Sequence, residues 1–170
     1  MIAMKNILVA TDFGEAADSA LTYGRELAQR FGSTLHVLHV AENVYITAFG
    51  AETYASFAPD LQRDLEETAQ RRLHEAILDS DGSGPRTVPV VMTSSSPAFA
   101  IIDYAREHGI DLIIMGTHGR GALGHILMGS VAERVVRLAS CPVLTIRQPQ
   151  HEFVYPDGLV AVREPARRQS

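Results

Sequence analysis

The chain has 170 residues, of which 46% are hydrophobic and 21% charged, and its formal net charge is −5 at pH 7. This length and hydrophobic content are enough to bury one core, so a single domain is expected. The acidic balance argues against a nucleic-acid-binding surface, and a single cysteine excludes an internal disulfide. The first apolar run, residues 7–10, is too short for a signal peptide or a membrane span, so we expect a cytoplasmic protein that binds no membrane.

Short apolar runs alternate along the chain with segments whose apolar residues recur at helical spacing. Helices are predicted over residues 16–31, 61–77, 97–105 and 131–138. Gly32 ends the first of them, Pro59 suits the first turn of the second, and the segment 41–58 is expected to be loose. Strands are predicted over residues 6–10, 34–40, 87–92, 111–115 and 142–146.

Strands that alternate with helices of this length form a parallel sheet with helices on both faces. Pro89 lacks the N–H that a central strand needs, so its strand is expected at an edge of the sheet. The simplest arrangement is a three-layer α/β/α domain with a five-stranded parallel sheet in the order 3-2-1-4-5. In such a sheet, ligands bind beyond the carboxyl ends of the first and fourth strands, here residues 10–12 and 115–116.

The connection after the fourth strand is long and rich in glycine. It runs from Gly116 to Ser130, about twice the 2–6 residues of most such loops. Glycines let a ligand approach the main chain, and the helix that follows offers unpaired N–H groups and the positive end of its dipole. The alternative to a ligand-binding loop is a long turn whose glycines serve its conformation alone. Loop length and helix placement together favour a phosphate cradle at the same crevice.

The spacing within this connection resembles a family signature. The pattern G-x-x-G-x9-G-S is formed by Gly116, Gly119, Gly129 and Ser130. It is similar to that of the ATP-binding class of the universal stress protein family, and the resemblance covers residues 4–147. It implies a Rossmann-like fold similar to the adenine nucleotide alpha hydrolases. It also implies a dimeric stress-response protein that binds ATP or another adenine nucleotide, with or without Mg²⁺, and has no efficient catalysis.

The resemblance also implies which residues form the site. Ala10, Thr11 and Val40 would line the adenine, and Asp12 would lie by the ribose or by a metal-bridged phosphate. One departure from the family is Ser96 before Pro97, where a glycine is usual. The ribose and the phosphates would be held by Met115, Gly116, Gly119, Gly129, Ser130 and Val131.

Several of these residues have a structural alternative. Asp12 cannot favourably face bare phosphates, because like charges repel in a partly desolvated site. It is a ligand for ribose, adenine or Mg²⁺, a cap of the first helix, or both. Ser130 is likewise a phosphate ligand or a cap of the fourth helix. His118 and Arg120 are candidates to neutralise phosphate charge, and Arg120 is equally well a solvated loop charge.

Patterns for catalysis and for metal binding are absent from the sequence. Lys5 is the only lysine, so there is no P-loop lysine, and neither G-x-S-x-G nor C-x-x-C occurs. His36 and His39 are three apart on one strand and should face opposite sides of the sheet, so no metal site of protein ligands alone is predicted. The alternatives to a regulatory nucleotide binder are a slow Mg-dependent ATPase or phosphotransferase and an interaction module that binds no nucleotide.

The last strand is apolar and is expected at the other edge of the sheet. Exposed apolar edges pair with other strands, so this strand is expected to join two copies of the chain in a homodimer. A further protein partner, which the sequence does not identify, would read the bound state. The domain spans residues 1–147, and residues 148–170 are expected to form a hairpin and then a solvated tail. The interface residues are Val143, Leu144, Thr145 and Ile146.

Overall fold

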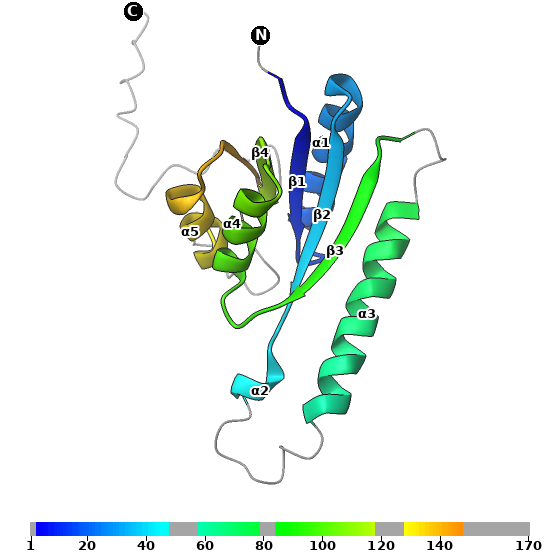
Figure 1. Cartoon of the computed structure of the whole chain (residues 1–170), viewed down its shortest axis with the longest axis vertical. Coiled ribbons are helices and arrows are strands. Elements are labelled where there is room, and N and C mark those ends of the chain that lie inside the picture. Colours follow the sequence, from blue (N-terminus) through cyan, green and yellow to red (C-terminus); the bar gives the residue numbers. More distant parts are fainter. Residues whose placement is uncertain (1–2, 48–57, 79–83, 118–127, 148–170) are drawn as a thin grey trace, which may run out of the picture.

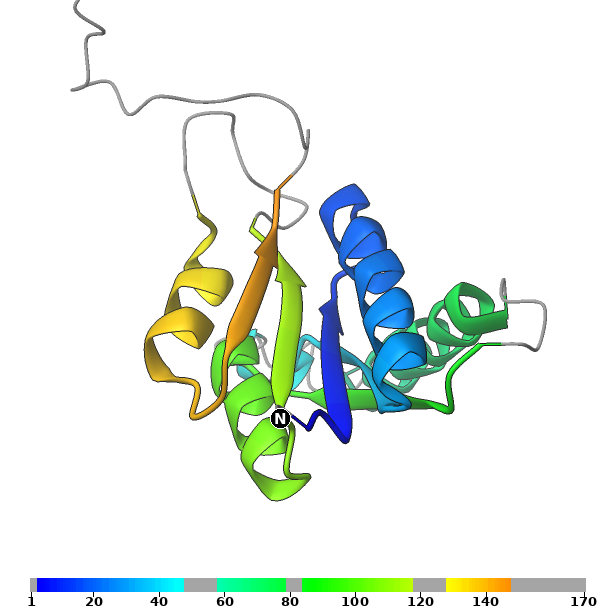
Figure 2. The same ribbon diagram turned by 90° about the horizontal axis from the view of Figure 1, so that it is seen from above.

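The computed structural model describes residues 3–47, 58–78, 84–117 and 128–147 of the chain (Figure 1). Within them, a five-stranded sheet lies between two layers of helices, which Figure 2 shows on either side of the strands. The helices are α1 (Glu15–Phe31), α2 (Val44–Thr47), α3 (Ala58–Leu78), α4 (Pro97–Glu107) and α5 (Ser130–Leu138). The strands are β1 (Asn6–Thr11), β2 (Thr34–Ala41), β3 (Thr87–Thr93), β4 (Leu112–Gly116) and β5 (Val143–Ile146).

The strand order is β3-β2-β1-β4-β5 and every pairing is parallel, which confirms the predicted topology. Pro89 lies in β3 opposite Val37 of β2, so the proline is on an edge strand as predicted. The order reverses between β1 and β4, whose paired residues end with Ala10 opposite Met115. The carboxyl ends of these two strands therefore lie next to each other.

Residues of the central strands alternate between the two faces of the sheet. Leu8 and Leu38 belong to a buried cluster that α4 and α5 cover, whereas Val9 and Val37 belong to a second cluster covered by α1 and α3. These four side chains are at most 1% exposed. Since burial of each such side chain contributes about 1.5–3 kcal/mol, the central strands are held from both sides.

The helix boundaries follow the sequence, with one exception. Gly32 ends α1 in the left-handed conformation (φ 65°), which glycine adopts without strain, and Pro59 lies in the first turn of α3. The exception is α2, which lies in the segment that was expected to be loose. The N–H of Val44 at its start donates to Oε1 of Gln62, 3.0 Å away in α3. A side chain 18 positions further along the chain thus supports this helical turn.

Some predictions concern parts of the chain that the structure does not describe. The expected hairpin and tail over residues 148–170 lie outside the described residues, and so do residues 118–127 of the glycine-rich connection. In the described ranges, no helix has the length and apolar character needed to cross a membrane.

Candidate functional site

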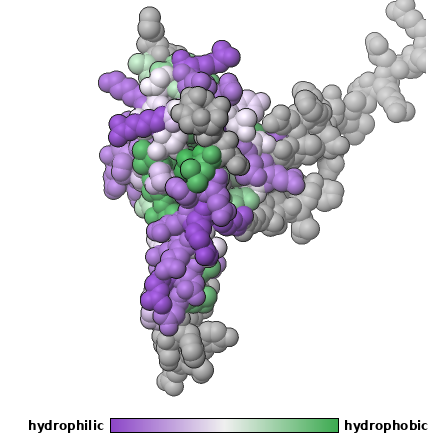
Figure 3. All heavy atoms as spheres, turned by 90° about the vertical axis from the view of Figure 1, so that its right-hand side faces the viewer, coloured by the Kyte–Doolittle hydropathy of each residue, from purple (hydrophilic) through white to green (hydrophobic). Residues whose placement is uncertain are grey.

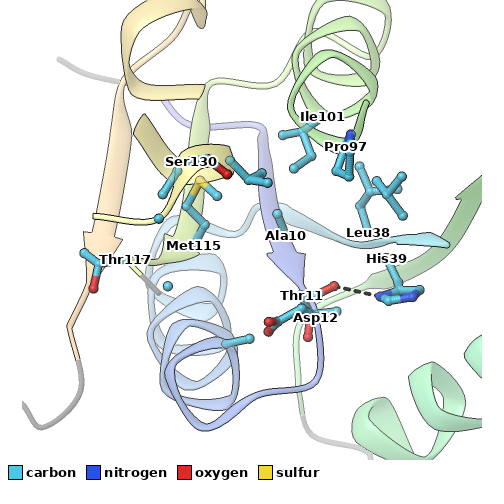
Figure 4. A pocket seen from close by; sticks show the side chains of 16 residues that line it. Ala10, Thr11, Asp12, Leu38, His39, Pro97, Ile101, Met115, Thr117 and Ser130 are labelled. Carbon is cyan, nitrogen blue, oxygen red and sulfur yellow. Dashed lines mark hydrogen bonds between the residues drawn. The ribbon is translucent and has the colours of Figure 1, made fainter. Parts of the chain in front are cut away.

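A cavity of about 470 Å³ lies at the carboxyl ends of β1, β2 and β4, where the strand order reverses. Figure 4 shows Leu38, Pro97 and Ile101 gathered on one side of it. Asp12, at the end of β1, and Ser130, at the start of α5, lie at other parts of its wall. The cavity therefore has one apolar side, and its polar side chains come from other elements.

Every predicted nucleotide-binding residue that the structure describes lines this cavity. The predicted residues His118, Gly119 and Arg120 lie outside the described residues. Residues far apart in the sequence thus meet at the crevice that the topology predicted. Those that line the cavity are Ala10, Thr11, Asp12, Val40, Met115, Gly116, Gly129, Ser130 and Val131.

The turn between β1 and α1 is held by side-chain hydrogen bonds. Thr11 Oγ1 accepts the N–H of Phe13 and Asp12 Oδ1 accepts the N–H of Gly14, each at 3.0 Å. Helix α1 has Gly14 as its N-cap and no side-chain capping bond, so the alternative that Asp12 caps the helix is wrong. Asp12 instead closes the turn that precedes the helix, because its Oδ1 accepts the N–H of Gly14, the N-cap residue two positions later.

The start of α5 presents main-chain groups to the cavity. Its N-cap is Gly129, with no side-chain capping bond, and Ser130 is already the first helical residue. The alternative that Ser130 caps the helix is therefore wrong. Residues Gly129 to Ala132 line the cavity, so the first turn of the helix borders it. The N–H groups of a first turn and the positive end of the dipole favour an anion there.

Hydrogen bonds join the two described ends of the glycine-rich connection to the sheet. The N–H of Thr117 donates to the carbonyl of Ile146 in β5 (2.8 Å), and the N–H of Gly129 donates to the carbonyl of Thr117 (2.6 Å).

Gly116 has a packing role that the sequence did not reveal. A Cβ at this position would lie 2.8 Å from the Cβ of Ala16, so glycine lets α1 approach β4 closely.

Sequence reasoning missed some lining residues. His39, at the end of β2, donates from Nδ1 to the carbonyl oxygen of Thr11, 2.9 Å away. Its position near the carboxyl end of a strand next to β1 would have been enough to predict that His39 lines the cavity. Pro97 and Ile101 reach the cavity only because α4 packs against β2, and no local pattern indicates that contact.

The described lining residues carry little charge. Asp12 is the only carboxylate among them, and none is lysine or arginine. An anion in this cavity would therefore rely on the N–H groups of α5, with a cation required wherever it approaches Asp12. In the part of the chain that the structure describes, no group of three or more His, Cys, Asp or Glu could hold a metal ion.

His36 and His39 face opposite sides of the sheet, as predicted. His36 Nδ1 lies 2.8 Å from the hydroxyl oxygen of Tyr104 in α4, whereas the His39 ring lies 4.4 Å from that of Phe13. Burial, with a smaller contribution from nearby His108, lowers the pKa of His36. The neutral His36 side chain thus belongs to the core beneath α4 and not to the cavity.

The predicted interface residues form β5, at the edge of the sheet opposite β3. One side of β5 pairs with β4, and within the described residues no strand pairs with its other side. Val143, Leu144 and Thr145 are half-buried and Ile146 is buried. The strand therefore has the position expected for an interface.

The fold and the cavity define a class: a three-layer α/β protein with a cavity at the reversal point of a parallel sheet. More narrowly, the chain belongs to the universal stress protein family, whose model matches residues 4–147. The universal stress protein MJ0531 of Methanocaldococcus jannaschii is 30% identical over 148 residues, which cover 87% of this chain and 85% of that protein.

Solved structures have the same fold. Protein MJ0577 of Methanocaldococcus jannaschii superposes with a TM-score of 0.75 at 29% identity, over 86% of this chain and 98% of that chain. A universal stress protein solved in complex with cAMP superposes with a TM-score of 0.60 at 20% identity, over 86% of this chain and 98% of that one. At 20% identity, the likeness to this second protein shows the fold alone.

Proposed function

We propose that this chain binds an adenine nucleotide in the cavity at the ends of β1 and β4 and acts as a regulatory protein in stress responses. One observation carries the proposal: the start of α5 and Asp12 line the same cavity, whose other side is apolar. The apolar side chains suit a base, and the N–H groups of α5 suit a phosphate. Membership of the universal stress protein family supports the stress-response role.

Two structural neighbours support the ligand class. One is the universal stress protein in complex with cAMP, and the other is a universal stress protein from Archaeoglobus fulgidus in complex with dAMP. Both of those ligands are adenine nucleotides with one phosphate. We propose ATP for this chain because its family signature is that of the ATP-binding class, and AMP is the natural competitor in any test.

The proposed arrangement follows the chemistry of the wall. The adenine lies by Ala10, Thr11 and Val40, on the apolar side. Asp12 lies by the ribose hydroxyls, which donate to it, or shares a Mg²⁺ ion with the phosphates. When bound, Mg²⁺ would supply the positive charge that the described wall lacks. The ribose and phosphates lie by Met115, Gly116, Gly129, Ser130 and Val131, with Gly119, His118 and Arg120 as further candidates.

We propose binding without efficient catalysis. The described wall offers no lysine or arginine to stabilise a transferred phosphoryl group, and Oδ1 of Asp12 already accepts the Gly14 N–H. The enzyme alternative is a slow Mg-dependent ATPase or phosphotransferase that uses Asp12. Single-turnover phosphate release from Mg·ATP that disappears in Asp12→Ala would favour the enzyme.

We further propose that two copies of the chain associate through β5, with another protein reading their state in the cytoplasm. The apolar strand Val143–Ile146 offers its outer edge for pairing, and a second β5 is the simplest partner. Analytical ultracentrifugation at micromolar concentration should give a dimer. A monomer under those conditions would contradict this part of the proposal.

The nucleotide proposal is tested by its bound content. The purified protein is denatured and the supernatant is separated on a nucleotide column, for the wild type, Asp12→Asn and Gly129→Val. Asp18→Asn is the matched control, because Asp18 is an exposed aspartate of α1 that does not line the cavity. Adenine nucleotide is expected from the wild type and the control and not from the two cavity variants. A clean supernatant and no thermal shift with Mg·ATP would favour the interaction module.

A further inference from the structure

The turn between β1 and α1 contains a strained residue. Phe13 has φ +63°, and it is the only non-glycine residue with a positive φ among the residues that the structure describes. A bulky side chain rarely adopts this left-handed conformation, which persists only where the surroundings hold it. Phe13 directly follows Asp12, so the strain lies at the wall of the cavity.

Contacts from three elements hold Phe13 in this conformation. Its N–H donates to Thr11 Oγ1 (3.0 Å), and the centroid of its ring lies 4.4 Å from that of His39 in β2. The guanidinium carbon of Arg72, in α3, lies 4.4 Å from the Phe13 ring centroid, which is the geometry of a cation–π contact. The Nδ1–H of His39 in turn donates to the Thr11 carbonyl, so ring and turn are fixed together.

Arg72 differs from most of the charged residues of its helix. Figure 3 shows that the outer surface of α3 is largely hydrophilic, and Arg71 is among the exposed residues of this helix. Arg72 is half-buried, with its guanidinium over Phe13. No residue of α3 lines the described cavity, so Arg72 reaches the site only through the Phe13 ring.

The backbone of the strained residue directs the hydrogen bond between the Gly14 N–H and the Asp12 carboxylate. Oδ1 of Asp12 accepts the N–H of Gly14, and the direction of that N–H depends on the backbone of Phe13 between them. Rotation of Phe13 to an ordinary φ would turn the Gly14 N–H away from Asp12. The contacts of His39 and Arg72 with the ring oppose that rotation.

We infer that Phe13, held by Arg72 and His39, is a positioning residue that sets the Asp12 carboxylate in the cavity before the ligand arrives. The inference rests on the proposed function for the identity of the ligand, an adenine nucleotide. By this inference α3 contributes to the binding site through Arg72, although no residue of the helix lines the described cavity.

The first test needs no nucleotide. Hydrogen exchange of the Gly14 amide, measured by NMR, reports the bond to Asp12 Oδ1 directly. Exchange is expected to be about tenfold faster in Phe13→Ala and in Arg72→Met, because the turn opens more often. Arg72→Lys keeps a cation near the ring and should restore part of the protection. The matched controls are Phe31→Ala, an exposed phenylalanine at the far end of α1, and Arg71→Met, and both should exchange like the wild type.

The second test separates positioning of Asp12 from a general loss of structure. The affinity for Mg·ATP is measured by calorimetric titration for Phe13→Ala, Asp12→Asn and the double variant. Phe13→Ala should bind about fivefold more weakly, and it should add no further loss in the Asp12→Asn background, because contacting residues that act as a unit are not additive. The same cycle with Arg72→Met leaves the sequence of the turn intact and serves if Phe13→Ala fails to fold.

The outcomes distinguish the inference from the proposed function. Unchanged exchange of the Gly14 amide in both variants, or an equal loss of affinity in both backgrounds, would overturn the positioning role. If the wild type takes up no nucleotide, the proposed function fails, and the exchange experiment alone decides whether Phe13 and Arg72 position Asp12.

Discussion

The two connections that border the cavity act by different means. Between β1 and α1, the side chains of Thr11 and Asp12 make the hydrogen bonds that shape the turn. Between β4 and α5, the bonds come from the main chain, with the Gly129 N–H on the Thr117 carbonyl and the first turn of α5 at the cavity. The connection between β1 and α1 therefore offers a hydrogen-bond acceptor, the Asp12 carboxylate, and the connection between β4 and α5 offers main-chain N–H donors. A ligand with both hydroxyl groups and phosphates would match this pair.

The largest effect is expected from Gly116, whose role is packing. Gly116→Val should lower the free energy of unfolding by about 2–3 kcal/mol, because the new side chain would meet Ala16 of α1. Gly129→Val should lower it by at most about 1 kcal/mol, since Gly129 has φ −69°, which any residue adopts. Urea unfolding followed by circular dichroism checks the difference. Equal losses would mean that the two glycines of the connection are not distinct in role.

The next largest effect is expected at the acceptor of the first connection. Asp12→Ala should weaken binding of Mg·ATP by about 2 kcal/mol, the usual contribution of hydrogen bonds to a charged group. Calorimetric titration with and without Mg²⁺ measures this loss. Asp18→Ala, an exposed aspartate in the first turn of α1, is the control and should bind normally. A loss that is the same in both variants would point to net charge instead of position.

A smaller effect is expected at the start of α5. Ser130→Ala should weaken nucleotide binding by about 1.5 kcal/mol through loss of one hydrogen bond from its hydroxyl to the charged phosphate. Stability should not change, because α5 has no side-chain capping bond to lose. Thermal unfolding and titration of the same preparation separate the two effects, with Ser140→Ala, an exposed serine after α5, as the control. A fall in unfolding temperature for Ser130→Ala alone would restore the capping role.

The smallest effect is expected from Gly14. A Cβ at this position would lie 3.1 Å from Asp12 Oδ1, so Gly14→Ala should displace the carboxylate slightly. The backbone there (φ −94°, ψ 166°) suits any residue, and stability should therefore be retained. Binding of Mg·ATP should weaken about threefold, which corresponds to about 0.6 kcal/mol. Unaltered binding would show that the ligand does not depend on where Oδ1 lies.

The sequence predicted the sheet because each strand carries its own signal. Continuous apolar runs mark the buried strands, their alternation with helices most simply gives the strand order, and the edge position of Pro89 agrees with that order. It did not predict α2, because that turn depends on Gln62 in the next helix. A hydrogen bond between distant residues leaves no periodic pattern in either segment.

The site was predictable where it follows a strand directly in sequence. The sequence identified Thr11, Asp12 and Gly116 in this way. Ile101 lines the cavity only because α4 packs there, and no local sequence pattern indicates that contact. The capping alternatives for Asp12 and Ser130 failed by one or two residues. A difference of one position separates a cap from a first helical residue, and sequence patterns do not fix helix ends that finely.

The bond between the Gly129 N–H and the Thr117 carbonyl has a consequence for the length of the chain between them. The fold itself brings these two positions together, so the ends of the intervening chain meet through contacts that do not depend on its length. Loop closure is an entropic cost that grows only with the logarithm of length, by about 0.6 kcal/mol for each doubling. Insertions at this point, including a reporter domain, would therefore cost the molecule little stability.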